Sequence, residues 1–214
     1  MDKKRVGIAL FHNVEVLDFC GPFEVFSVTR LNNETRHEET PSFEVLLLAE
    51  HEGSILTSGG MEVLPHCTFE NAPALDILLV PGGLGIRKEI DNPVMIDWIE
   101  KRSREVQTLA SVCTGAMLLG KAGLLDGRVA TTHWRSLDWM RDSFPAVDVD
   151  DQRHFVRDGN VYTSAGISAG IDLSLVIVAE YFGEKMARAT ARYMEYPYPE
   201  NAKRRIKLQS EVTR

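Results

Sequence analysis

Hydrophobic residues in this chain occur in short continuous runs that alternate with longer segments of helical periodicity. Such runs are typical of strands buried on both faces, in a parallel sheet that helices cover. The predicted fold is therefore α/β, a three-layer flavodoxin-like sandwich with a mostly parallel sheet flanked by helices. The pattern predicts strands at residues 6–11, 43–49, 75–80 and 106–112 and helices at 21–31, 93–104, 114–122 and 168–182.

Turn residues interrupt this alternation and predict small hairpin additions. Segments 54–57 and 61–64 flank a Gly-Gly pair, and segments 155–157 and 161–163 flank Asp-Gly-Asn. The polar stretch 32–42 is expected to be a surface loop. The chain from Tyr196 onward carries two prolines and is expected to be extended, with its basic residues 203–205 forming a solvated helix face.

Length and charge narrow the class of protein. A chain of 214 residues that is 44% hydrophobic suffices for one large core, and it shows no repeat or linker, so residues 1–214 are expected to form a single domain. The net charge of -7 argues against a nucleic-acid surface. The apolar stretch 171–182 contains Asp172 and Glu180, so no membrane span is expected. Three unpatterned cysteines and a start without a signal peptide favour the cytoplasm.

Candidate chemistry gathers where three predicted strands end. The first strand is followed by a loop that contains Asp18, the central strand runs into Pro81-Gly82-Gly83-Leu84-Gly85, and the next ends at Cys113. Ligands of an open parallel sheet bind in the crevice outside the carboxyl ends of the strands. We expect the three loops to face one crevice.

Cys113 is the strongest candidate for a nucleophile. It occupies a sharp turn, rich in small residues, between a strand and a helix. The amino terminus of a helix favours a thiolate and is expected to lower the pKa of this cysteine. The alternative is that Cys113 is a small hydrophobic core residue.

The Gly82-Gly83 pair is expected to help bind substrate. If the N–H groups of Gly83 and Thr114 point into the crevice, they would form an oxyanion hole for a substrate attacked by Cys113. A phosphate loop is rejected at residues 115–121, since its interior is apolar and helical and Ala122 replaces the metal-binding Ser or Thr.

The remaining cysteines are expected to be structural. Cys20 has no base nearby in the sequence, and Cys67 follows Pro65 in an irregular segment. His66 lies beside Cys67, yet no second pair of ligands has the spacing of a zinc site, so no metal site is predicted.

These motifs resemble a known superfamily. The elbow Val112-Cys113-Thr114-Gly115, the preceding Pro81-Gly82-Gly83 and the downstream Ala130-Thr131-Thr132-His133-Trp134 are similar to the ThiJ/PfpI superfamily, whose fold is that of class I glutamine amidotransferases. Residues 17–22, Leu-Asp-Phe-Cys-Gly-Pro, and the pair Glu195-Tyr196 resemble its isocyanide hydratase branch more narrowly.

The resemblance implies a homodimeric enzyme without a cofactor that hydrates an isocyanide to an N-substituted formamide. Cys113 would attack the terminal carbon, Asp18 would hydrogen-bond the sulfur and move protons, and Thr114 would position the intermediate. His133 would line the site. The alternative for Asp18 is a carboxylate that only caps its loop.

Other functions remain open within the same superfamily. Its peptidases carry a histidine directly after the cysteine, where this chain has Thr114, and nothing after Glu180 supplies the His and acidic partner of a glutaminase. The same motifs also resemble the amino-terminal part of helix-turn-helix regulators. A ligand or redox sensor, or another hydrolase or glyoxalase-type activity, is therefore the alternative to a hydratase.

Overall fold

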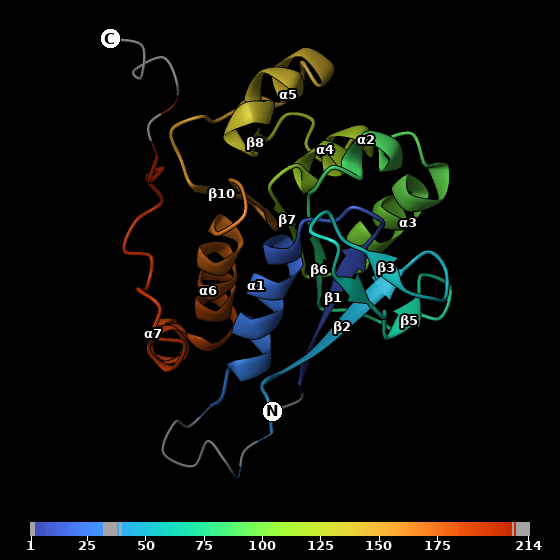
Figure 1. Ribbon diagram of the computed structural model, residues 1–214. Helices are drawn as coiled ribbons and strands as arrows, with labels where there is room; N and C mark the ends of the chain where they lie inside the picture. The colour runs from blue at the N-terminus through green and yellow to red at the C-terminus, as the bar shows by residue number, and fades with distance from the viewer. Residues whose placement is uncertain (1–2, 32–37, 39, 207, 209–214) are drawn as a thin grey trace.

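A seven-stranded sheet forms the middle layer of the computed structural model, which describes residues 3–31, 38, 40–206 and 208 (Figure 1). Only β10 runs antiparallel to its neighbour, so the predicted mostly parallel sheet is confirmed. The strands in spatial order are β10 (Phe155–Asp158), β11 (Val161–Ser164), β7 (Thr108–Val112), β6 (Ile77–Val80), β1 (Lys4–Leu10), β2 (Phe43–Ala49) and β5 (Cys67–Thr68).

Helices cover both faces of this sheet (Figure 1). Helices α1 (Val16–Val28), α6 (Ala169–Phe182) and α7 (Glu184–Tyr193) pack together on one side. Helices α2 (Ile86–Glu89), α3 (Pro93–Ser103) and α4 (Gly115–Lys121) form the other layer. The three-layer sandwich is thereby confirmed. None of the described helices is both long and apolar enough to cross a membrane.

The central strands are wholly buried, which explains why their sequences are apolar without alternation. All residues of β6 and β7 are buried, and each strand has helices above and below it. Strand β2 has the predicted bounds, and the other predicted strands and helices are present with ends shifted by a few residues. The sequence patterns missed α2, α7 and the small elements β5, β8 (Val129–Ala130), β9 (Asp148–Val149), η1 (Trp134–Ser136) and α5 (Leu137–Ser143).

The first helix begins five residues before its predicted start, at Val16 instead of residue 21. Proline is common in the first turn of a helix. In the structure Pro22 lies inside α1, and the buried side chain of Phe19 draws the preceding turn into the core. Asp18 consequently lies in the first turn of a helix rather than in a loop.

The two hairpins differ in their role. Strands β3 (Ile55–Leu56) and β4 (Glu62–Val63) form the predicted separate hairpin. Strands β10 and β11 also pair as predicted, but the expectation that they are a local addition is wrong, because β11 joins the main sheet beside β7. This pairing carries the chain after Ser164 to the end of β7.

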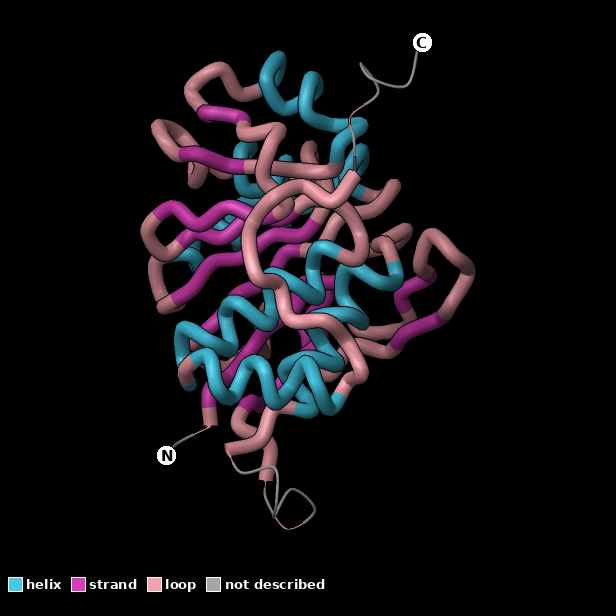
Figure 2. Tube along the Cα trace, turned by 90° about the vertical axis from the view of Figure 1, so that its left-hand side faces the viewer, coloured by secondary structure: helices cyan, strands magenta, loops and turns pink. Residues whose placement is uncertain are grey.

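The carboxyl-terminal tail is extended and crosses outside the α6 layer (Figure 2). Its backbone bonds to the segment before β10, with His154 N donating to Ala202 O at 2.6 Å and Arg204 N to Gln152 O at 2.9 Å. The basic residues are therefore not a helix face, as we expected, because the tail pairs like an extra strand. Residues 32–37 and 39 of the predicted surface loop lie outside the described residues.

Asp76 joins the starts of β1 and β6 and yields a test of the sheet. Its carboxylate accepts from Lys4 Nζ and Arg5 N, both at 2.8 Å. Burial opposes ionisation, but these two donors hold the pKa of Asp76 below its usual value. Its stabilising effect is therefore present above about pH 4 and lost as pH falls through the lowered folded pKa.

We expect Asp76→Asn to reduce the free energy of unfolding at neutral pH by about 1 to 2 kcal/mol. The difference from wild type is expected to shrink toward about pH 3, measured by urea denaturation. Glu44→Gln, which removes a half-exposed partner of Arg5, is the control and changes stability little. A loss of equal size at both pH values would show that the charge of Asp76 is not what stabilises the sheet.

Candidate active site

Cys113 lies on the predicted sharp turn between β7 and α4 and has a backbone φ of 57°. A positive φ is strained for a residue with a side chain and persists only where its surroundings hold it. Here Cys113 N donates to Ser164 O and Ala165 O at 3.2 and 3.1 Å, and the Thr132 hydroxyl donates to Cys113 O at 2.8 Å. Hydrogen bonds therefore hold the peptide groups on both sides of Cys113 in place.

Glycines let the neighbouring chain segments approach this turn. A Cβ on Gly115 would come within 2.1 Å of Val80 O, and a Cβ on Gly82 would come within 2.5 Å of Thr114 N. Side chains at these positions would push the loop after β6 away from the turn. The residues that indicated the site in the sequence are therefore small because the neighbouring chain segments leave no space for larger side chains.

The structure brings Asp18 to Cys113, as the position of their loops at one sheet edge predicted. Asp18 is fully buried, and its Oδ2 accepts a hydrogen bond from Gly82 N at 2.9 Å. Its Oδ1 has no partner of good geometry among the described residues. The Cys113 thiol and the Ile167 N–H lie near enough to interact with the carboxyl group.

Burial raises the pKa of Asp18 to about 7, although Gly82 N–H and Cys113 favour its charged form. The negative charge of Glu15 adds to the rise. Asp18 also lies in the first turn of α1, where the helix dipole favours a carboxylate, so desolvation outweighs the dipole here. A carboxyl group of this kind can hold a proton and release it near neutral pH.

The expectation that the helix terminus lowers the pKa of Cys113 is wrong. Burial raises the pKa of this thiol and the Asp18 charge raises it further, while the N–H and hydroxyl groups of Thr114 oppose the rise. The thiol is only 6% exposed, and α4 is short. Asp18 and Cys113 together therefore resist carrying two negative charges, and a thiolate forms as a proton moves to a neighbour.

The Gly83 N–H group does not face the cavity, as the expected oxyanion hole of Gly83 and Thr114 required. Gly83 N donates to the Thr114 hydroxyl at 3.0 Å, and Gly82 N donates to Asp18. The Thr114 N–H interacts with the Cys113 side chain. Both glycine donors thus orient side chains of the site rather than facing a substrate.

His133 lines the same cavity but is not paired with Cys113 by a hydrogen bond among the described residues. Its Nδ1 accepts from Arg135 N at 3.3 Å, and its ring packs on Gly166, where a Cβ would come within 2.0 Å of Cδ2. Burial and the charges of Arg135 and Arg204 hold the pKa of His133 below its usual value. The imidazole is therefore uncharged and forms part of the cavity wall.

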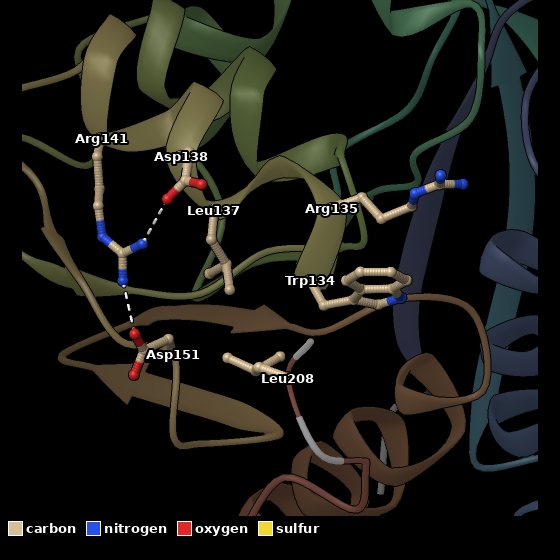
Figure 3. A pocket seen from close by; sticks show the side chains of 7 residues that line it. All are labelled: Trp134, Arg135, Leu137, Asp138, Arg141, Asp151 and Leu208. Atoms are coloured by element: carbon tan, nitrogen blue, oxygen red, sulfur yellow. Dashed lines mark hydrogen bonds and ion pairs between the residues drawn. The ribbon is translucent and has the colours of Figure 1, made fainter. Parts of the chain in front are cut away.

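The cavity in front of Cys113 has a volume of 480 Å³. This volume suits a small molecule. A different cavity of 340 Å³ lies between α5 and the tail and does not reach the cysteine (Figure 3). The residues that line the Cys113 cavity are Glu15, Gly83, Leu84, Ile86, Arg87, Cys113, Thr114, His133, Arg135, Ser136, Trp139 and Ile167.

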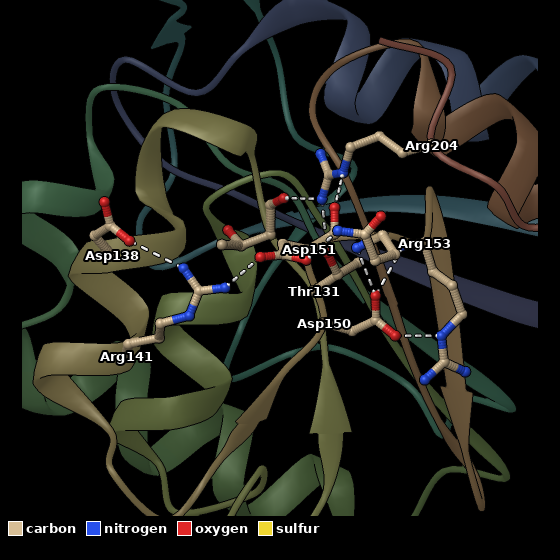
Figure 4. A network of polar contacts seen from close by, with 9 residues as sticks. Thr131, Asp138, Arg141, Asp150, Asp151, Arg153 and Arg204 are labelled. Carbon is tan, nitrogen blue, oxygen red and sulfur yellow. Dashed lines mark hydrogen bonds and ion pairs between the residues drawn. The ribbon is translucent and has the colours of Figure 1, made fainter. Parts of the chain in front are cut away.

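Arg204 supports the site from the tail, and the sequence patterns missed it. Its guanidinium group donates to Thr131 Oγ1 at 2.9 Å and to Thr132 O at 3.4 Å (Figure 4). Thr132 in turn holds the carbonyl of Cys113. Arg204 and Thr131 are 73 residues apart, so no local pattern could have linked them.

Cys20 and Cys67 are partly buried free thiols that do not line the cavity. Within the described ranges, no group of three or more His, Cys, Asp or Glu residues could hold a metal ion.

The fold and site define a class, the α/β sandwiches with a cysteine on a strand-to-helix elbow. Residues 4–180 match the model of the DJ-1/PfpI family, and the chain belongs to that family. This confirms the superfamily that the sequence motifs resemble.

Relatives within the family differ in function. The isonitrile hydratase of Pseudomonas putida is 35% identical over 90% of this chain and 78% of its own length. The HTH-type transcriptional regulator GbdR of Pseudomonas aeruginosa is 29% identical over 90% of this chain, which spans 51% of the regulator. A solved ThiJ/PfpI family protein from Pseudomonas syringae matches with a TM-score of 0.81 at 27% identity, covering 94% of this chain and 78% of that one.

The buried carboxyl group predicts an unusual pH dependence of stability. Unfolded Asp18 loses its proton near pH 4, whereas folded Asp18 keeps it to about 7. Wild-type stability therefore falls as pH rises across this window. Asp18→Asn, which cannot ionise, is expected to be more stable than wild type above the window, by on the order of 3 kcal/mol.

The measurement is the midpoint of thermal unfolding from about pH 4 to pH 8, where the advantage of the variant is expected to grow with pH. Asp97→Asn, an exposed aspartate of α3, is the matched control and keeps the wild-type profile. A constant difference between Asp18→Asn and wild type would show that Asp18 does not titrate in this window.

Removal of the hydrogen bonds that Arg204 makes to the segment with Thr132 is expected to make Cys113 more accessible. Arg204→Met frees Thr132 from the tail, so alkylation of Cys113 by iodoacetamide is expected to accelerate by about two- to tenfold through local opening. Mass spectrometry of the Cys113 peptide measures the rate, and Arg192→Met on the exposed face of α7 is the control. An unchanged rate with a lower melting temperature would limit Arg204 to a role in tail stability.

Proposed function

We propose that the protein is a cysteine-dependent hydratase that adds water to an isocyanide and releases an N-substituted formamide, without a cofactor. The observation that carries the proposal is the buried Asp18 carboxyl group beside Cys113, with a pKa of about 7. Hydration needs a proton donor next to the carbon that is attacked. The similarity to an isonitrile hydratase supports the same chemistry.

The proposed reaction starts at sulfur. Cys113 sulfur bonds to the terminal carbon of the isocyanide, and that carbon receives a proton from Asp18. The thiol proton passes to Asp18, so the product of this step is a neutral thioimidate. The Thr114 N–H and hydroxyl groups stabilise the negative sulfur while the proton is in transit.

Water completes the reaction. It adds to the carbon of the thioimidate, and its proton moves through Asp18 to the nitrogen. The carbon–sulfur bond then breaks, the formamide leaves, and Cys113 regains its proton. One water is consumed for each isocyanide, and no electron donor or acceptor is needed.

The second candidate is a ligand sensor related to the amino-terminal part of helix-turn-helix regulators. The match to GbdR over 90% of this chain favours it. Redox sensing is the less favoured form, because oxidation follows thiolate character and exposure, and Cys113 is buried with a raised pKa. Another cysteine hydrolase or glyoxalase-type activity is a further alternative.

The homodimeric state, the cytoplasmic location and the single-domain organisation stay predictions from the sequence. None of them is needed for the proposed chemistry, because every group named above comes from one chain.

The test is turnover of a small aromatic isocyanide, followed by ultraviolet absorbance. Cys113→Ala is expected to abolish turnover, whereas Cys67→Ala, a matched change at a thiol outside the cavity, is expected to retain it. Asp18→Asn is expected to lower kcat by about a hundredfold or more with little effect on KM, since it removes the proton donor.

The outcomes separate the candidates. Turnover by Cys113→Ala would place the chemistry elsewhere. Absence of turnover in the wild-type protein with every isocyanide tried would overturn the hydratase and favour the sensor.

A further inference from the structure

Two arginines line the cavity in front of Cys113 and have no acidic partner among the residues that the structure describes. Arg87 comes from α2 and Arg135 from η1. In the described part of the chain, neither guanidinium group makes a hydrogen bond or an ion pair. Both side chains are exposed to solvent at the cavity.

Arg141 of α5, by contrast, is paired with carboxylates. Arg141 bonds to Asp138 and Asp151 at 2.9 and 2.8 Å, and Figure 3 shows Arg135 pointing away from both of these carboxylates. The protein has 31 acidic and 24 basic residues, so acidic partners are in excess. Two unneutralised guanidinium groups in one cavity are therefore a local positive charge on a negative protein.

Aromatic rings hold the two guanidinium groups at the cavity. The Arg87 group lies 5.9 Å from the centre of the Trp139 ring, and the Arg135 group lies 5.4 Å from that of Trp134. Stacking on an aromatic face orients a guanidinium group and leaves its N–H edge free to bind an anion. The neighbouring Glu15 carboxylate accepts a hydrogen bond from the Ser58 hydroxyl at 3.1 Å.

We propose that the substrate of this site is an anionic isocyanide, whose carboxylate binds Arg87 and Arg135 while its terminal carbon faces Cys113. This inference rests on the proposed hydratase function and names its substrate class. Guanidinium and carboxylate groups match in geometry and charge, and the pair is stronger than a neutral hydrogen bond. The cavity volume of 480 Å³ accommodates a small carboxylated isocyanide.

The first test compares para-isocyanobenzoate with its methyl ester, which differ in charge and share the reacting group. The wild-type protein is expected to hydrate the acid with a kcat/KM at least about tenfold above that of the ester. Arg87→Gln and Arg135→Gln are each expected to raise KM for the acid. The double variant is expected to abolish the preference for the acid over the ester.

Arg192→Gln is the matched control, because it removes the same charge from α7, which does not line the cavity. It is expected to keep the wild-type preference. Equal or better turnover of the ester by the wild-type protein, or a preference that survives in the double variant, would overturn the anionic substrate and leave the hydratase intact.

A second test does not depend on turnover. Iodoacetate and iodoacetamide alkylate the same thiol but differ in charge, so the ratio of their rates at Cys113 reports the affinity of the cavity for a carboxylate. The ratio is expected to fall severalfold in the double variant and to stay constant in Arg192→Gln. If no isocyanide is hydrated but this ratio falls, the hydratase fails and the carboxylate site stands. An unchanged ratio overturns the carboxylate site.

Discussion

The carboxyl group of Asp18 and the thiol of Cys113 lie together in a buried environment, where desolvation opposes two negative charges. Burial raises the pKa of both groups, and the charge of Asp18 raises that of Cys113 further, whereas the Cys113 thiol favours the charged form of Asp18. The proton between them is therefore the reactive element of the proposed chemistry, since sulfur becomes nucleophilic as its proton moves away. Gly82 and Thr114 serve this pair by donating to the carboxylate and to the sulfur.

The surrounding structure keeps that pair together against backbone strain. Cys113 has a positive φ, and its peptide groups are held by the chain after β11 and by Thr132. The tail extends this support, because Arg204 bonds to the segment that contains Thr132. The site thus depends on packing between elements distant in sequence, and α1, which carries Asp18, packs beside α6 on the same face of the sheet.

The wall of the cavity has a different character from its floor. The floor holds the buried Cys113 thiol, with the Asp18 carboxyl group beside it, whereas the rim carries Arg87 and Arg135 without acidic partners among the described residues. A buried floor suits a neutral isocyanide carbon, and a charged rim suits an anionic substituent on the same molecule. The anionic isocyanide that we propose matches both the floor and the rim of the cavity. A wholly apolar or a wholly charged ligand would match only one of them.

Residue patterns alone predicted the sandwich, the elbow at Cys113 and the meeting of that elbow with Asp18. Buried strands require continuous apolar runs, and the carboxyl ends of parallel strands share one edge. Four features became evident from the folded chain: the direction of the Cys113 pKa shift, the partners of the glycine N–H groups, the place of β11 in the sheet and the contact of Arg204. These depend on burial and on contacts between distant segments, which local residue patterns do not encode.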